Sequence, residues 1–196
     1  MSEFIDPILF KDLAACDPKE VVKRTHAQYD PSTGQYRVEV WGRSYEVDPV
    51  KERAAAPDAR STKYQDYMSL FVLHYLMKAV DIPLSGEWVS EKDIPGGEGF
   101  FRGPHTLPVH EIVKTFGDDV HAFSRACEQV GGIPLAMADA AFVFKITPRI
   151  PVAILFWQGD EDFEGEVKLL FDRTVSLHLP LDIIYALAVV ICHSTY

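Results

Sequence analysis

The stretch PVAILFWQGDEDFEGEVKLLFD, residues 151–172, decides the fold of this chain. The unbroken apolar run from Val152 to Trp157 predicts a strand that is buried on both faces. Pro151 suits the first position of a strand, where its missing N–H breaks no ladder hydrogen bond. The polarity reverses over residues 158–162, and the strand pattern resumes over residues 167–171. This stretch therefore predicts a β-hairpin with a long acidic loop.

The loop of this hairpin raises the question of a cation site. Asp160, Asp162 and Glu164, followed by Gly165, match the opening of a calcium-binding loop. The match fails at the twelfth position, where Phe171 stands in place of a bidentate Glu, and strands flank the loop where helices are required. Asp side chains in such turns commonly accept backbone N–H groups and hold the loop. We favour this structural role and predict no metal site.

Composition excludes several classes of protein. The chain has 196 residues, of which 47% are hydrophobic and 24% are charged, as is ordinary for a globular protein. The net charge of −10, without a cluster of Lys and Arg, argues against a nucleic-acid partner. No apolar run is long enough to span a membrane, and no secretory signal is recognisable at the start. The three cysteines form no C-x-x-C pair, so we expect a reducing, cytoplasmic setting.

The patterning of the remaining chain predicts a single domain over residues 1–196. We expect an N-terminal helix and hairpin in residues 1–50, a linker at 51–62 and a main body at 63–196. The segment 64–80 is apolar nearly all round, which is typical of a central buried helix. The fold class we predict is α+β, with an antiparallel sheet built from the two hairpins and helices packed on one face. The other expected elements are a helix at 7–29, strands at 36–40, 45–47 and 142–146, and helices at 108–116, 118–130 and 181–192.

Residues 81–108 contain no long regular element, and long loops inside compact domains are commonly functional. This loop combines aromatic residues with several glycines, among them the pair Gly96 and Gly97. No strand–turn–helix context surrounds these glycines, so they do not form a dinucleotide fingerprint. We expect them to allow a close backbone approach, either to a ligand or to the apolar helix beneath.

Several separate motifs, taken in their order and spacing, resemble the uncharacterised family catalogued as domain of unknown function 3786. The resemblance covers nearly the whole chain from about Arg24. Its motifs are Leu73–Leu76, Gly86–Trp88, Pro95–Gly97, Phe116–Gly117, Gly131–Gly132, Pro148–Val152, Trp157–Asp160, Asp162–Phe163, Leu170–Asp172 and Leu179–Pro180.

This resemblance implies a place near corrinoid or one-carbon metabolism in anaerobes. Some related proteins carry an iron–sulphur cluster domain, so an iron–sulphur or corrinoid protein is a candidate partner. This chain lacks the cluster cysteines, and a cluster must therefore sit on another protein. His178 stands where the family pattern has a tyrosine-like position, and the family supplies no established catalytic residues.

Our first hypothesis is a binding or accessory module that holds a small, planar or apolar molecule between the glycine-rich loop and the hairpin tip. Such sites are mostly apolar with a few convergent polar groups. Large aromatic residues also fill protein cores, which is the competing interpretation. The candidate ligand-binding residues are Trp88, Gly96, Gly97, Phe100, Phe101, Trp157, Asp160 and Asp162, with Glu87 as an orienting carboxylate.

Two alternatives belong to other classes. The chain is an enzyme if His74 acts as general base with Glu87 or Asp160 as its partner, although a His within a buried helix is more often a satisfied core group. The sequence identifies no cofactor for either hypothesis. A third alternative is a structural interaction protein whose acidic surface attracts a basic partner.

Overall fold

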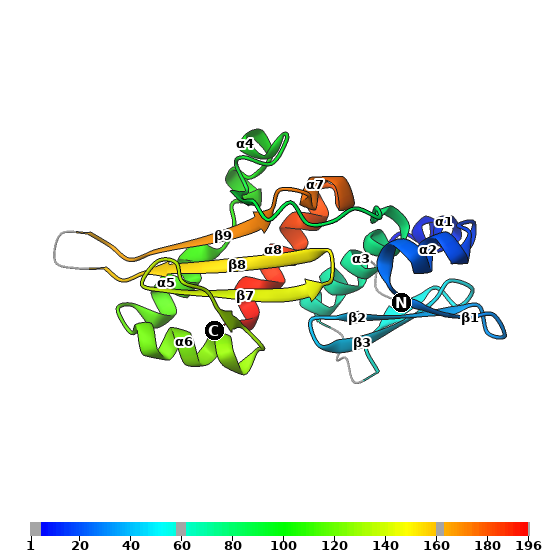
Figure 1. Ribbon diagram of the computed structural model, residues 1–196, viewed down its shortest axis with the longest axis horizontal. Coiled ribbons are helices and arrows are strands. Elements are labelled where there is room, and N and C mark those ends of the chain that lie inside the picture. The colour runs from blue at the N-terminus through cyan, green and yellow to red at the C-terminus, as the bar shows by residue number, and fades with distance from the viewer. Residues whose placement is uncertain (1–4, 58–61, 160–162, 196) are drawn as a thin grey trace.

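The computed structural model describes residues 5–57, 62–159 and 163–195 (Figure 1). The α+β fold class is confirmed, because helices accompany two antiparallel sheets. The helices are α1 (Ile8–Ala14), α2 (Pro18–Thr25), α3 (Lys63–Lys78), α4 (Gly97–Phe100), α5 (Val109–Phe116), α6 (Val120–Gln129), α7 (Val175–His178) and α8 (Leu181–Ser194). The strands are β1 (Gln28–Asp30), β2 (Gln35–Val40), β3 (Arg43–Asp48), β4 (Arg53–Ala55), β5 (Trp88–Ser90), β6 (Ile133–Pro134), β7 (Ala140–Thr147), β8 (Ile150–Trp157) and β9 (Glu166–Asp172).

The two predicted hairpins lie in two different sheets. The β2–β3 hairpin belongs to a four-stranded sheet of order β1-β2-β3-β4, and the β8–β9 hairpin to a five-stranded sheet of order β5-β9-β8-β7-β6. Figure 1 shows the two sheets side by side along the long axis, with α3 between them and the β7–β8 turn pointing toward α3.

The prediction of one continuous helix over residues 7–29 is wrong, because the chain forms two helices, α1 and α2, and the strand β1 there. Pro18 has no N–H to extend α1, and it starts α2 at the position after the cap. Asp17 caps α2 by accepting the Lys19 N–H at 3.0 Å. The predicted linker at 51–62 also contains a strand, since Arg53–Ala55 pairs with β3.

The five-stranded sheet packs one face on helices. Alternate residues of β8, namely Val152, Ile154 and Phe156, point into the main core with residues of α5, α6 and α8. The other face carries a smaller apolar group around Ala153 and Leu155. Residues 152–156 are each 3% exposed or less, so the predicted burial of this strand on both faces is confirmed for them.

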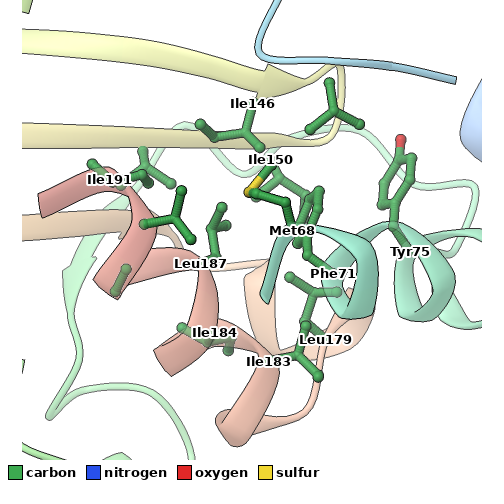
Figure 2. Packing of buried hydrophobic residues seen from close by; sticks show 14 of the residues in the cluster. Met68, Phe71, Tyr75, Ile146, Ile150, Leu179, Ile183, Ile184, Leu187 and Ile191 are labelled. Carbon is green, nitrogen blue, oxygen red and sulfur yellow. The ribbon is translucent and has the colours of Figure 1, made fainter. Parts of the chain in front are cut away.

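The centre of the molecule is the contact between α3, α8 and the turn that joins β7 to β8. Figure 2 shows Met68 and Phe71 of α3 facing Leu187 of α8, with Ile146 and Ile150 above them. One continuous cluster of buried apolar side chains extends from this point beneath both sheets. The helix predicted at 64–80 is confirmed as α3, and most of its apolar residues are buried.

Among the described residues, no helix is both long enough and apolar enough to cross a membrane.

Candidate functional site

The turn between β2 and β3 is built from an unexpected residue. Trp41 has φ +50° and Gly42 has φ +68°, and such two-residue hairpin turns strongly favour Asn-Gly. A left-handed conformation costs a bulky residue about 1–2 kcal/mol, and three contacts offset that cost. The Trp41 indole N–H donates to the Val130 carbonyl at 2.8 Å, its backbone N–H donates to the Ile146 carbonyl at 2.8 Å, and its ring lies 5.2 Å from that of Phe144.

A cavity of about 670 Å³ opens beside this turn, which we call the junction cavity. Four segments that are distant in sequence form its walls: the β2–β3 hairpin, the start of α3, the end of α6 and the end of α8. Its lining residues are Val40, Trp41, Arg43, Tyr45, Thr62, Tyr64, Gln65, Met68, Gln129, Val130, Gly131, Val190 and Ser194.

The described walls of the junction cavity combine aromatic, aliphatic and neutral polar side chains, with a charge at one position. Among the described residues, Arg43 is the only charged one in its lining, and its guanidinium makes no hydrogen bond or ion pair with any of them. Burial raises the pKa of Tyr45 above its ordinary value, although the neighbouring Arg43 and a hydrogen bond with Gln65 oppose this, so its phenol is neutral at pH 7. The Tyr64 ring stacks on His193 with 3.7 Å between centroids.

The aromatic residues that sequence patterning put into one ligand site lie apart. Trp88 and Trp157 share the outer face of the five-stranded sheet, where each is half-buried. Trp88 pairs with Asp172 and Trp157 with Glu166, at opposite ends of β9 and six residues apart, or roughly 20 Å at strand spacing. Phe100 packs against the main core on the opposite side, and its ring stacks on His105. These three residues therefore form no common pocket.

The glycine pair serves close packing within the chain itself. A Cβ on Gly97 would lie 1.9 Å from the backbone oxygen of Glu91. Gly96 has φ +79°, and a Cβ there would lie 3.3 Å from the Leu181 side chain of α8. Of the two roles expected for these glycines, close approach to a neighbouring backbone and helix is the one that the geometry displays.

The proposed acid–base residues are placed as follows. His74 is half-buried on α3, and its Nδ1 is buried and makes no hydrogen bond with any residue that the structure describes. Burial lowers the pKa of His74, Asp182 opposes this, and Lys78 adds to it. Glu87 is exposed and lies in an ion pair with Arg173, whose guanidinium donates two 2.5 Å hydrogen bonds that lower the pKa of the carboxyl group.

Glu87 is thus engaged by Arg173 and is not among the charged neighbours that affect the pKa of His74. Asp160 and Asp162 lie outside the described residues. Elsewhere in the described ranges, no group of three or more His, Cys, Asp or Glu side chains is arranged to hold a metal ion.

Sequence reasoning missed the junction cavity because its walls come from four segments that are spread along the chain from Val40 to Ser194. One local signal was available. Trp41-Gly42 separates two strands with alternating polarity, and a bulky residue at that turn position is rare enough to indicate a special role.

The fold and this cavity define an α+β protein with an aromatic pocket at the junction of two antiparallel sheets. The chain belongs to the family described as Domain of unknown function (DUF3786), whose family model matches residues 17–194. The family assignment suggested by the separate sequence motifs is therefore confirmed. No curated protein and no solved structure matches the chain.

Proposed function

We propose that this protein binds a small planar anion in the junction cavity. The observation that supports the proposal is one cation, Arg43, without an ion-pair partner among the described residues, on a wall whose other described side chains are neutral, in a chain with a net charge of −10. The volume of about 670 Å³ falls within the range of small-molecule sites, roughly 300–1,000 Å³. A cavity of this kind is suited to bind and orient a molecule.

The lining residues divide into two functions. Trp41 and Tyr64, both half-buried, offer ring surface against which a planar molecule packs, and the buried Tyr45 forms the wall behind them. The guanidinium of Arg43 presents a planar fork of N–H groups that matches a carboxylate or phosphate. Neutral donors and acceptors from Gln65 and Gln129 complete the rim. The ligand class is therefore an aromatic or heteroaromatic acid.

A matched pair of probes tests the charge requirement. Indole-3-acetate and indole-3-acetamide share the ring and differ in the anionic group, and calorimetry measures both dissociation constants. We expect the acid to bind at least about tenfold more tightly, because charge-assisted hydrogen bonds contribute about 1.5–3 kcal/mol. Arg43→Gln removes the preference. Arg53→Gln, an exposed arginine of the same sheet that does not line the cavity, retains it. Equal binding of acid and amide by the wild-type protein contradicts the proposal.

A second experiment identifies the natural ligand. Native mass spectrometry with an absorbance scan, on protein purified anaerobically, detects a retained mass or chromophore. The corrinoid or one-carbon context implied by the family resemblance remains a proposal, in which this chain acts as an accessory to a corrinoid or iron–sulphur protein. A retained aromatic acid supports the junction cavity as the binding site. A retained cation contradicts the proposal, because the guanidinium of Arg43 would repel it.

A further inference from the structure

One edge of strand β9 is paired with another strand over only part of its length. β5 pairs only with the C-terminal end of β9, through Trp88–Ser90 against Leu170–Asp172. On its other side, β9 pairs with β8 from Glu166 to Phe171. Among the described residues, no strand pairs with Glu166–Leu169 on the β5 side.

The direction of the backbone groups on this edge follows from the register. Arg173 donates its backbone N–H to the Glu87 carbonyl at 2.9 Å, in continuation of the β5–β9 pairing. Backbone groups of an antiparallel strand point alternately to its two neighbours. The odd-numbered residues of β9 therefore direct their N–H and C=O groups toward the β5 side. At Val167 and Leu169 no described residue bonds with these groups.

The two residues are nevertheless shielded from bulk solvent. Val167 is 4% exposed and Leu169 is 1% exposed. Buried backbone donors and acceptors without partners are rare in folded proteins, because each one costs free energy comparable to a lost hydrogen bond. Four such groups, two donors and two acceptors at strand spacing, match the hydrogen-bonding pattern that an added antiparallel strand offers.

A cavity of about 520 Å³ runs along this edge, and we call it the edge groove. It is bounded by β9 on one side and by the loop from β5 to α5 on the other. Its lining residues are Glu91, Lys92, Glu98, Phe101, Arg102, Gly103, Thr106, Leu107, Val109, Glu166, Val167, Lys168 and Leu169. The charged rim is largely self-neutralised, since Arg102 pairs with Glu98 at 2.9 Å and Lys168 pairs with Glu166 at 3.0 Å.

After β5 ends, the chain turns away from β9 and leaves the position beside Val167 and Leu169 without a strand. Asp93 closes a turn on Ser90, with its N–H donating to the Ser90 carbonyl at 3.1 Å and its carboxylate accepting from the Ser90 hydroxyl at 2.6 Å. Gly97 then packs against the Glu91 carbonyl, where no side chain fits. These contacts hold the loop away from β9 directly after β5 ends.

We propose that the edge groove binds an extended peptide segment of a partner protein, which adds to the sheet as a strand antiparallel to β9 and in line with β5. The two peptide residues opposite Leu169 and Val167 exchange backbone hydrogen bonds with them. Their side chains share the inner face with those two residues and meet Phe101 and Leu107. The residue between them lies opposite Lys168 and points outward. The groove therefore selects an apolar–polar–apolar segment.

Peptide N-methylation tests this register directly. The probe is acetyl-Thr-Val-Thr-Val-Thr-amide, titrated to millimolar concentration into ¹⁵N-labelled full-length protein. We expect the largest amide shifts at Val167 and Leu169. N-methylation of both valines removes the N–H groups that point toward β9 and weakens binding at least about tenfold. N-methylation of the central threonine, whose N–H points away, leaves binding within about threefold.

A pair of protein variants locates the site independently of the peptide chemistry. Thr106 is exposed and lines the edge groove, so Thr106→Trp fills the groove without disturbing the core. Thr115→Trp, on an exposed face of α5 outside the groove, is the control. We expect loss of peptide binding in the first variant and retention in the second.

Three results overturn the proposal. One is the absence of any shift at Val167 and Leu169, which indicates a hydrated groove only. Another is equal weakening by the two N-methylation patterns. The third is a concentration-dependent shift of these amides without peptide, which identifies a second copy of the chain as the occupant. None of these results bears on the junction cavity, which is formed by other segments.

Discussion

The indole N–H of Trp41 donates a 2.8 Å hydrogen bond to the carbonyl of Val130, which lies 89 positions further along the chain. Val130 is the residue that follows α6, and α6 packs on β7 of the five-stranded sheet. The hairpin turn of one sheet is thereby tied to a helix of the other. This contact holds two walls of the junction cavity together, and it explains why a tryptophan occupies a turn position with positive φ.

Removing this hydrogen bond while keeping an aromatic ring tests its contribution. We expect Trp41→Phe to lower the free energy of unfolding by about 1 kcal/mol, because a partly buried carbonyl loses its donor. Urea denaturation followed by circular dichroism gives the value. Trp157→Phe is the control, since that indole donates no hydrogen bond to a described residue. Equal stability of the two variants would show that the Trp41 bond contributes nothing.

Alanine substitutions at Gly97 and Gly99, two glycines of α4, are expected to change the stability of the protein in different ways. Gly97→Ala puts a Cβ 1.9 Å from the Glu91 backbone oxygen, so the loop or α4 must move, and we expect a loss of about 1–3 kcal/mol. Gly99→Ala meets no atom within 4 Å and gains helix propensity, so we expect no loss or a gain of up to about 1 kcal/mol. Thermal unfolding of both variants separates the two cases.

Asp172 is a buried carboxylate with five donors. It accepts hydrogen bonds from the backbone N–H groups of Ser85, Gly86 and Thr174 and from the hydroxyls of Ser85 and Thr174. Burial alone would raise the pKa of Asp172, but the hydrogen bonds from Thr174 and Ser85 outweigh it and lower the pKa to about 2. The ionised carboxylate therefore fixes the loop before β5 to the end of β9.

This low pKa predicts a loss of stability in acid. Because the folded pKa lies below the unfolded value, Asp172 stabilises the protein fully above about pH 4, and this stabilisation is lost as the pH falls toward 2. We expect Asp172→Asn to lower the free energy of unfolding at pH 7 by about 2 kcal/mol and to flatten the decline between pH 4 and pH 2. Asp118→Asn is an exposed control. A parallel decline in wild type and Asp172→Asn would contradict this assignment.

His178 predicts a second pH dependence at a higher pH. The side chain is 1% exposed, and its Nδ1 accepts the Val80 backbone N–H at 3.2 Å. Burial lowers the pKa of His178 below its ordinary value of 6.5, Arg149 lowers it further, and Asp172 opposes both. Neutral imidazole is thus the folded form, and the stability it supports is present above about pH 6.5 and is lost as the pH falls through the folded pKa.

We therefore expect His178→Gln, which retains an acceptor for the Val80 N–H, to weaken the dependence of unfolding free energy on pH below 6.5. His121→Gln, an exposed histidine on α6, leaves that dependence unchanged. Denaturant midpoints between pH 5 and pH 8 measure the effect. If both variants follow the wild-type curve, protonation of His178 does not limit stability in this range.

Elements with a strong local pattern were predictable. The apolar run of β8, the nearly all-apolar α3 and the closing helix α8 were each expected close to their observed bounds. The error at residues 7–29 arose because apolar spacing continues across Asp17-Pro18, where the chain changes from one helix to the next. Strand β4 was missed because three residues carry little periodicity of their own, and pairing with β3 decides their conformation.

The candidate sites were less predictable than the elements. Sequence patterning placed the ligand residues by chemical type, and it grouped Trp88, Phe100 and Trp157 because all three are aromatic. The register of β9 places Trp88 and Trp157 at opposite ends of that strand, and Phe100 lies on the other face of the sheet. Strand register and the choice of face depend on pairing between segments, so no single segment encodes them.

The sequence by itself determined the family, the α+β class and the identity of the strongest helices and strands, because these depend on periodicities of two and 3.6 residues within short windows. Only the tertiary structure decided that the hairpins enter separate sheets, that Arg43 joins aromatic residues in the wall of one cavity, and that part of β9 pairs with no other described strand on its β5 side. These features arise where segments far apart in the chain meet, and long-range packing rather than local propensity sets such contacts.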